Sequence, residues 1–296
     1  MTEYISDRRL RRQAPKYYLI GIAWPVYVFF LPFIWSVSKV FCVFYLLFAG
    51  VYLYNEMAQL MHECWHKYTP NINNNFFYTI YSYLLVTDPQ MYRLVHGYHH
   101  SKVNSWDDTE FHPLGRINNA FLRRAYNFVE IVVGFIFILG ILMWVLPRHE
   151  RYKDKYRKLG NIISIGVWIL IYGSLGLASA IVFDLTVSQI VVPYLINLWL
   201  CSFAIHHDQL IEHGGLIAAG DIHRRNLATR NLKHDTVMQK IVLFLAHNDP
   251  REHVLHHTMV KENSRPFPGT IPMPENAVYI SLGDYGRILR DMITKG

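Results

Sequence analysis

Long runs of apolar residues constrain the fold of this chain more than any other feature of its sequence. Five stretches, at 17–35, 40–58, 127–146, 162–182 and 187–205, carry few or no charged side chains. A transmembrane helix needs about 20 such residues. Only 17% of the chain is charged, whereas soluble proteins carry about 25%. The sequence therefore predicts an all-α integral membrane protein, because helices satisfy their own backbone hydrogen bonds in lipid.

The basic residues of the chain lie beside these apolar runs. The net charge is +7, and Arg8, Arg9, Arg11, Arg12 and Lys16 directly precede the first run. This distribution follows the positive-inside rule and places these flanks in the cytoplasm. A nucleic-acid partner is not expected, because no basic face with stacking aromatics is found outside the membrane flanks.

The run at 127–146 has basic residues on both sides. Arg123 and Arg124 precede it, and the segment RHERYKDKYRK at 148–158 follows it. Both flanks are therefore expected on the cytoplasmic side, and the run is predicted to be non-spanning or re-entrant, with a bend at Gly134 or Gly140. The other four runs would then cross the membrane. A single domain, 1–296, is expected, with the polar segments 59–126 and 206–296 forming one cytosolic cap.

The cap segments contain most of the sixteen histidines of the chain, and many of them are clustered. Three clusters stand in HECWH, HGYHH and HVLHH, and a further histidine stands in IEHGG. Residues at i, i+3 and i+4 share one face of a helix, so each cluster can direct its imidazoles at one point. The candidate metal ligands are His62, His66, His96, His99, His100, His213, His253, His256 and His257. A catalytic zinc takes about three protein ligands, so nine imidazoles suit two metal ions better.

Two other classes of protein compete with this interpretation. HECWH alone has the H-E-x-x-H spacing of a zinc protease, with Glu63 as the general base, but a protease leaves the two H-x-x-H-H clusters unexplained. A metal or haem transporter is the third alternative. Its histidines would be expected inside the membrane, whereas most of these lie outside the apolar runs.

The three clusters, taken in order, resemble the histidine boxes of the membrane fatty acid desaturase superfamily. About 30 residues separate the first two boxes and about 150 separate the second from the third. IEHGG resembles the isolated E-H-G element of alkane hydroxylases, and HND before HVLHH resembles the family's H-N…H-x-x-H-H. Leu255 is a departure, since the family usually has an acidic residue or glutamine there, and Pro250 lies upstream of the box.

The resemblance implies an oxygen-dependent oxidoreductase with two iron ions held by these nine histidines. Electrons would come from an external carrier such as ferredoxin or a cytochrome. The expected reaction is C–H abstraction from a lipid acyl chain to form a double bond. A hydroxylase or ketolase of the same superfamily, acting on an alkane, fatty acid or carotenoid, is the alternative. Substrate head group, regioselectivity and oligomeric state are left open.

Polar side chains near the boxes are expected to orient the imidazole rings or a bound water. These candidates are Glu63, Asp107, Asp108, Gln209, Glu212 and Asn248. Asp107, Asp108 and Glu110 also fit a solvated acidic loop. His206 and His207 end the last run, and hydrogen bonding rather than metal ligation is predicted for both.

Overall fold

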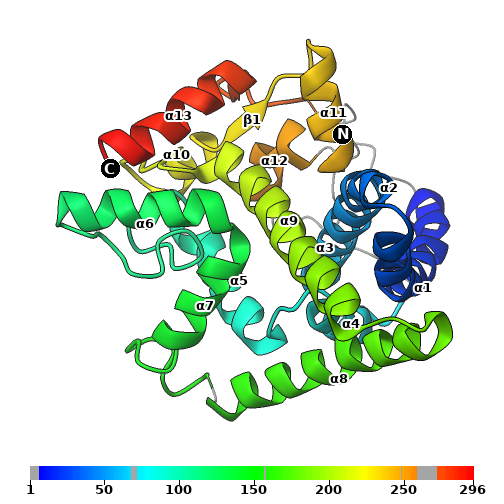
Figure 1. Cartoon of the computed structure of the whole chain (residues 1–296). Helices are drawn as coiled ribbons and strands as arrows, with labels where there is room; N and C mark the ends of the chain where they lie inside the picture. The colour runs from blue at the N-terminus through cyan, green and yellow to red at the C-terminus, as the bar shows by residue number, and fades with distance from the viewer. Residues whose placement is uncertain (1–6, 68–71, 157, 248, 259–271) are drawn as a thin grey trace. The chain divides into compact units, whose positions relative to one another are not determined.

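The computed structural model describes residues 7–67, 72–156, 158–247, 249–258 and 272–296 (Figure 1). The chain divides into two compact units. The first consists of Met1–Pro89 and Arg157–Cys201, and the second of Gln90–Tyr156 and Ser202–Gly296. Among the described residues nearly all regular structure is helical, so the predicted all-α class is confirmed.

The first unit holds the long apolar helices. Its elements are α1 (Asp7–Val37), α2 (Lys39–Phe44), a π-helical stretch (Tyr45–Gly50), α3 (Val51–His66), α4 (Asn74–Leu84), α8 (Lys158–Phe183) and the first part of α9 (Val187–His213). Four helical segments are long and apolar enough to span a membrane: Pro15–Val37, Lys39–His66, Gly160–Phe183 and Val187–His213. They include the four predicted spans, and the chain is a multi-pass membrane protein.

Tyrosine and tryptophan side chains link these helices through polar contacts. Trp24 Nε1 donates to Tyr172 Oη at 3.1 Å, and Tyr27 Oη donates to Asn197 Oδ1 at 2.8 Å. Such bonds matter because a polar group left unsatisfied in hydrocarbon is costly. The tyrosine-rich segment around α4 is core packing, since Phe77 and Tyr81 are buried and α4 packs on α3.

The second unit is built of shorter helices and one small sheet. Its elements are α5 (Pro89–Lys102, whose first residue closes the first unit), α6 (Ala120–Val133), α7 (Phe135–Val145), the end of α9, α10 (Ile222–Leu227), β1 (Arg230–Leu232), α11 (Val237–Leu245), a 3₁₀ turn (Asp249–Arg251), α12 (His253–Thr258), β2 (Val278–Ile280) and α13 (Leu282–Thr294). The two strands pair in parallel, with Arg230 opposite Val278. Three-residue strands leave no alternating pattern in a sequence, and this pair was not predicted.

Gly134 divides the apolar segment 127–146 between α6 and α7. Its φ of 77° and ψ of −153° lie in a region that essentially only glycine adopts. A Cβ at this position would lie 2.6 Å from the carbonyl oxygen of Ser202. The Ser202 hydroxyl spans the break, because it accepts from Ile136 N at 2.7 Å and donates to the Val133 carbonyl at 3.3 Å. Gly140 lies inside α7, where a Cβ would meet nothing within 4 Å.

Replacing Gly134 with alanine is therefore expected to destabilise the protein, by about 1–3 kcal/mol for the backbone strain alone. Gly140→Ala is the matched control in the next helix and should leave stability unchanged or slightly raised, because alanine favours helix. The measurement is the thermal unfolding midpoint of both variants in one detergent. Equal midpoints would show that the break at Gly134 is not needed for the fold.

Candidate metal centre

Helix α5 presents three histidines toward α12 within the second unit. His96, His99 and His100 occupy i, i+3 and i+4 of α5 and so share one face. His96 Nε2 lies 3.1 Å from His100 Nε2, and His256 Nε2 of α12 lies 3.2 Å from the same atom. Ring nitrogens from two helices thus converge into a first group.

A second group of ring nitrogens joins the end of α9 to α12. His213 Nε2 lies 3.3 Å from both His253 Nε2 and His257 Nε2, and these two are 3.1 Å apart. The ligand atoms of His99, His213 and His257 also lie within 4.8 Å of one another. The second unit therefore brings together seven of the nine predicted ligands.

The spacing within these groups fits metal ligation. Nitrogens about 2.1 Å from one tetrahedral ion lie about 3.3–3.4 Å apart, close to the distances found here. Imidazole suits zinc, copper, iron and nickel alike, so the ligand atoms do not select the metal by themselves. The residues present fit a transition-metal centre.

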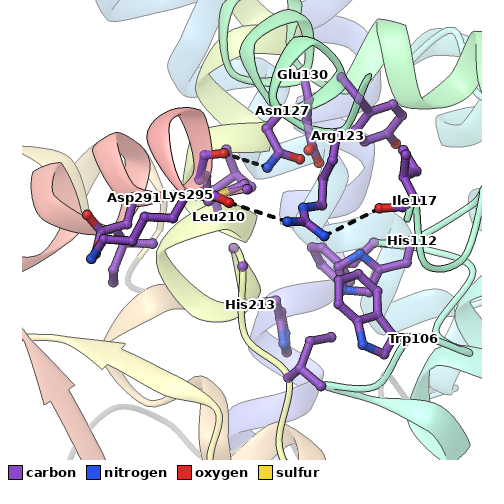
Figure 2. A pocket seen from close by; sticks show the side chains of 18 of the residues that line it. Trp106, His112, Ile117, Arg123, Asn127, Glu130, Leu210, His213, Asp291 and Lys295 are labelled. Atoms are coloured by element: carbon purple, nitrogen blue, oxygen red, sulfur yellow. Dashed lines mark hydrogen bonds and ion pairs between the residues drawn. The ribbon is translucent and has the colours of Figure 1, made fainter. Parts of the chain in front are cut away.

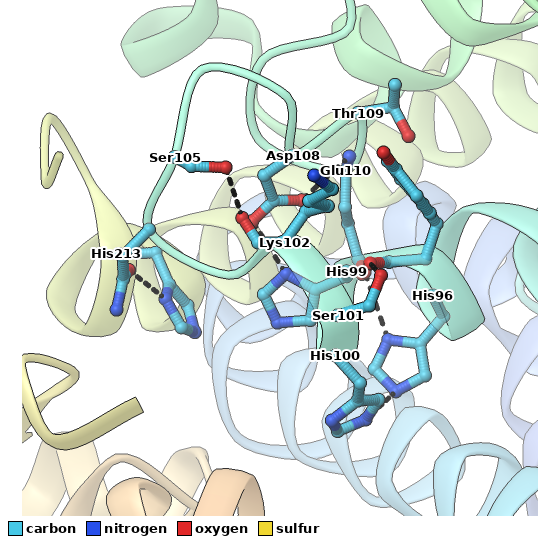
Figure 3. Close-up of polar contacts among 12 residues, drawn as sticks. His96, His99, His100, Ser101, Lys102, Ser105, Asp108, Thr109, Glu110 and His213 are labelled. Carbon is cyan, nitrogen blue, oxygen red and sulfur yellow. Dashed lines mark hydrogen bonds and ion pairs between the residues drawn. The ribbon is translucent and has the colours of Figure 1, made fainter. Parts of the chain in front are cut away.

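Buried carboxylates fix the orientation of the α5 rings. His99 Nδ1 lies 2.8 Å from Asp108 Oδ2, and His96 Nδ1 lies 3.0 Å from Glu110 Oε2 (Figure 3). An ionised carboxylate only accepts, so each Nδ1 carries the proton and donates. Each Nε2 is thus left with its lone pair, as a metal ligand requires.

Asn104 performs the same function for His213. Its Nδ2 donates to the Arg225 carbonyl at 2.7 Å and to Thr229 Oγ1 at 3.0 Å. Its Oδ1 therefore faces His213 Nδ1, at 2.9 Å, and that nitrogen must be the donor. Asn104 is buried and has a φ of 55°, a conformation that asparagine tolerates better than most residues. Sequence reasoning missed this residue, whose partners lie more than 100 positions away.

Glu212 supplies a carboxylate to the third box from outside it. Its Oε1 lies 3.1 Å from His253 Nδ1, and both side chains are nearly fully buried. Leu255, which occupies the usual acidic position of the box, is itself buried. Glu212 of α9 thus places a carboxylate beside His253 of α12, although position 255 within the box is a leucine.

Two asparagines hold α12 in place. Asn226 Nδ2 donates to the carbonyl of His257 at 3.0 Å. Asn231 of β1 accepts from Val254 N at 3.2 Å and donates to the Val278 carbonyl of β2 at 3.0 Å. The small sheet therefore anchors the helix that carries three predicted ligands. Neither asparagine was a sequence candidate.

Burial and charge set the protonation of the centre. Burial, with the neighbouring His253 and His99, keeps the pKa of His257 well below its usual value, so this ring is neutral near pH 7. Burial also acts to lower the pKa of His99, but Asp108 and Glu110 outweigh it and the pKa is raised. Burial acts to raise the pKa of Glu110, whereas His96 and His99 bring it below its ordinary value. Bound metal requires neutral imidazole, and His257 already meets that condition.

The other predicted residues lie as follows. Asp107 is largely exposed and pairs with Lys102 at 3.4 Å, whereas Gln209 is half-buried in α9, one turn before His213. Asn248 lies outside the described residues. His206 Nε2 lies 3.2 Å from Glu130 Oε1. His207 Nε2 donates to the Ile131 carbonyl at 3.0 Å, and its Nδ1 accepts from Tyr285 at 2.6 Å.

The first box belongs to the first unit. His62 and His66 lie one turn apart on α3, and their Nε2 atoms are separated by 3.2 Å. Glu63, between them in sequence, is buried and accepts a hydrogen bond from Tyr17 Oη at 2.6 Å. This pair has the nitrogen spacing found in the second unit.

Comparison with known protein families gives one match. The family model described as fatty acid desaturase matches residues 38–262, a range that includes all nine candidate ligands. No match was found among the curated proteins or among the solved structures.

Asp108→Ala is expected to weaken metal binding by about 10–100-fold, because His99 loses the acceptor that fixes its tautomer. Asp107→Ala is the matched control, since the carboxylate of Asp107 is next in sequence to Asp108 but is exposed and paired with Lys102. The dissociation constant is measured anaerobically for Fe²⁺ by competition with a chelator. The thermal unfolding midpoints of the metal-free variants serve as a control. An unchanged midpoint for Asp108→Ala would show that weaker binding comes from the orientation of His99 and not from unfolding. Equal affinities of the two variants would contradict the assigned role of Asp108.

Proposed function

The chain belongs to the fatty acid desaturase family, and from that premise we propose that it is an oxygen-dependent membrane oxidoreductase that inserts a double bond into a lipid acyl chain. The observation that carries the proposal is the convergence of imidazole Nε2 atoms at 3.1–3.3 Å in the second unit. Buried acceptors on several Nδ1 atoms support it, because they leave the opposite nitrogens available as ligands.

Two iron ions are proposed as the cofactor. The ligand set is His62, His66, His96, His99, His100, His213, His253, His256 and His257. When bound and reduced, iron would supply the electrons and the open positions needed to activate O2. Imidazole ligation differs from the Glu and Glu-x-x-His sets of soluble di-iron bundles. A separate carrier, such as ferredoxin or a cytochrome, is proposed to deliver the electrons.

The residues of the chain would position the ligands and exclude water. Asp108, Glu110 and Asn104 hold three imidazoles with their lone pairs inward. His99 and His257 are almost fully buried, and such burial limits side reactions with solvent. The positive-inside rule supports a cytoplasmic location for the second box, because Arg123 and Arg124 lie in the same polar segment, 59–126.

An aliphatic substrate is supported by a cavity in the first unit. It has a volume of about 240 Å³, and aromatic and aliphatic side chains dominate its lining. Trp24, Tyr54, Trp168, Tyr172 and Tyr194 are among the residues that line it. An acyl chain fits such a surface, since burying apolar groups provides the affinity.

Product analysis tests the reaction. The protein is expressed with a reductase system, and extracted lipids are compared by mass spectrometry with and without O2. Loss of two hydrogens from an acyl chain is expected in the wild type and absent in His99→Ala. An added oxygen atom would favour the hydroxylase or ketolase instead. Peptide cleavage with a single zinc would overturn the proposal in favour of the protease.

Metal counting tests the contribution of the first box. The wild type is expected to hold about two iron ions per chain, and His62→Ala combined with His66→Ala should hold about one or fewer. His223→Ala is the control, since this histidine is exposed on α10 and is not a proposed ligand. Iron is measured by elemental analysis of protein matched for thermal stability. An unchanged iron content in the double variant would remove the first box from the ligand set.

A further inference from the structure

A cavity of about 390 Å³ lies beside His213 in the second unit (Figure 2). Its walls come from the loop after the second box, from α6, from the end of α9, from β1 and from α13. The proposed metal chemistry uses only His213 among the lining residues. The other polar groups of the cavity need a separate explanation.

Two arginines of the lining have no carboxylate partner among the described residues. Arg230 is 7% exposed, and its Nη2 donates to the carbonyls of Gly214 and Leu210 at 2.5 and 3.4 Å. Arg123 donates to the carbonyls of Ile117 and Lys295 at 3.4 and 3.3 Å. The Nε atoms of both arginines are buried without a hydrogen-bond partner. Each guanidinium therefore retains one donor without a partner among the described residues, and both arginines line the cavity.

The carboxylates of the lining are already engaged. Glu130 lies 3.2 Å from His206, and Asp291 pairs with Lys295 at 2.8 Å. Burial lowers the pKa of Arg230 to about 10, so this side chain is still charged at neutral pH. The charge of Glu212 acts to raise the pKa of Arg230, but none of the ion pairs between described residues joins the two side chains. A buried charge without a directly paired counter-charge is costly, and an anion in the cavity would offset that cost. Guanidinium groups match the planar oxygens of carboxylate and phosphate.

Apolar side chains form a further part of the lining. Phe111, Leu114, Ile217, Ile288 and Met292 contribute side chains to the same cavity. A small inorganic anion would leave this surface in contact with water, whereas an anion carried on an apolar body would cover it. The ligand chemistry indicated is a carboxylate or phosphate joined to a hydrocarbon group.

We propose that this cavity binds an anionic amphiphile, whose acidic group is held by Arg123 and Arg230 and whose apolar part contacts Phe111, Ile217 and Ile288. Two sources can supply this chemistry. One is the acidic head of the lipid substrate, and that assignment rests on the proposed function. The other is a separate anionic lipid, which requires no turnover at all.

Calorimetry on the full chain in neutral-lipid nanodiscs tests the site with hexanoate, hexyl phosphate, hexanol and inorganic phosphate. Arg123→Gln removes one guanidinium from the half-buried face of α6, and Arg124→Gln is the matched control, exposed and outside the lining. Hexanoate and hexyl phosphate are expected to bind Arg123→Gln about tenfold or more weakly than the wild type. Arg124→Gln should bind them as the wild type does. Arg230→Lys keeps the positive charge but loses the planar guanidinium, and it should also weaken the binding of hexanoate and hexyl phosphate.

Three results would overturn the proposal. These are equal binding of hexanol and hexanoate, equal affinities of the Arg123 and Arg124 variants, and inorganic phosphate binding as tightly as hexyl phosphate. The measurement needs neither metal nor turnover, so it stands or falls separately from the desaturase proposal. Product analysis of Arg123→Gln then identifies the source of the anion. Reduced conversion of acidic acyl lipids indicates the substrate head, and unchanged conversion indicates a separate lipid.

Discussion

The direction in which each imidazole presents its lone pair is the constraint on which the candidate metal centre depends. A neutral histidine has one donor and one acceptor nitrogen, and an acceptor facing Nδ1 leaves Nε2 with the lone pair that a metal ligand would need. Asp108, Glu110 and Asn104 provide that acceptor at 2.8–3.0 Å. The loop after α5 contributes all three, so the sequence beyond the second box determines how the box can act.

The parts of the structure that the sequence predicts well are those set by local periodicity. Apolar runs of about 20 residues located the four candidate spans, and the i, i+3, i+4 spacing located the histidine faces of α5 and α12. In each case the pattern lies within one element, where backbone geometry alone decides which side chains share a face.

The features that escaped prediction depend on pairs of residues far apart in the chain. Asn104 and His213 are separated by 109 positions, and β1 meets β2 across a long intervening segment. Asn226 and Asn231 look like ordinary loop residues until their partners on α12 are known. Glu212 was a candidate from the sequence, but its neighbour His253 was not foreseen, because the two residues belong to different helices.

Helix α12 has only six residues, too few to persist through its own hydrogen bonds. Hydrogen bonds from Asn226 and from Asn231, which lies in the small sheet, stabilise this helix. A metal ion bound by the histidines of α12 would add its binding free energy directly to the stability of this helix. Binding of the proposed metal ions and ordering of the third box would then be a single equilibrium, and the metal would contribute to the stability of the fold.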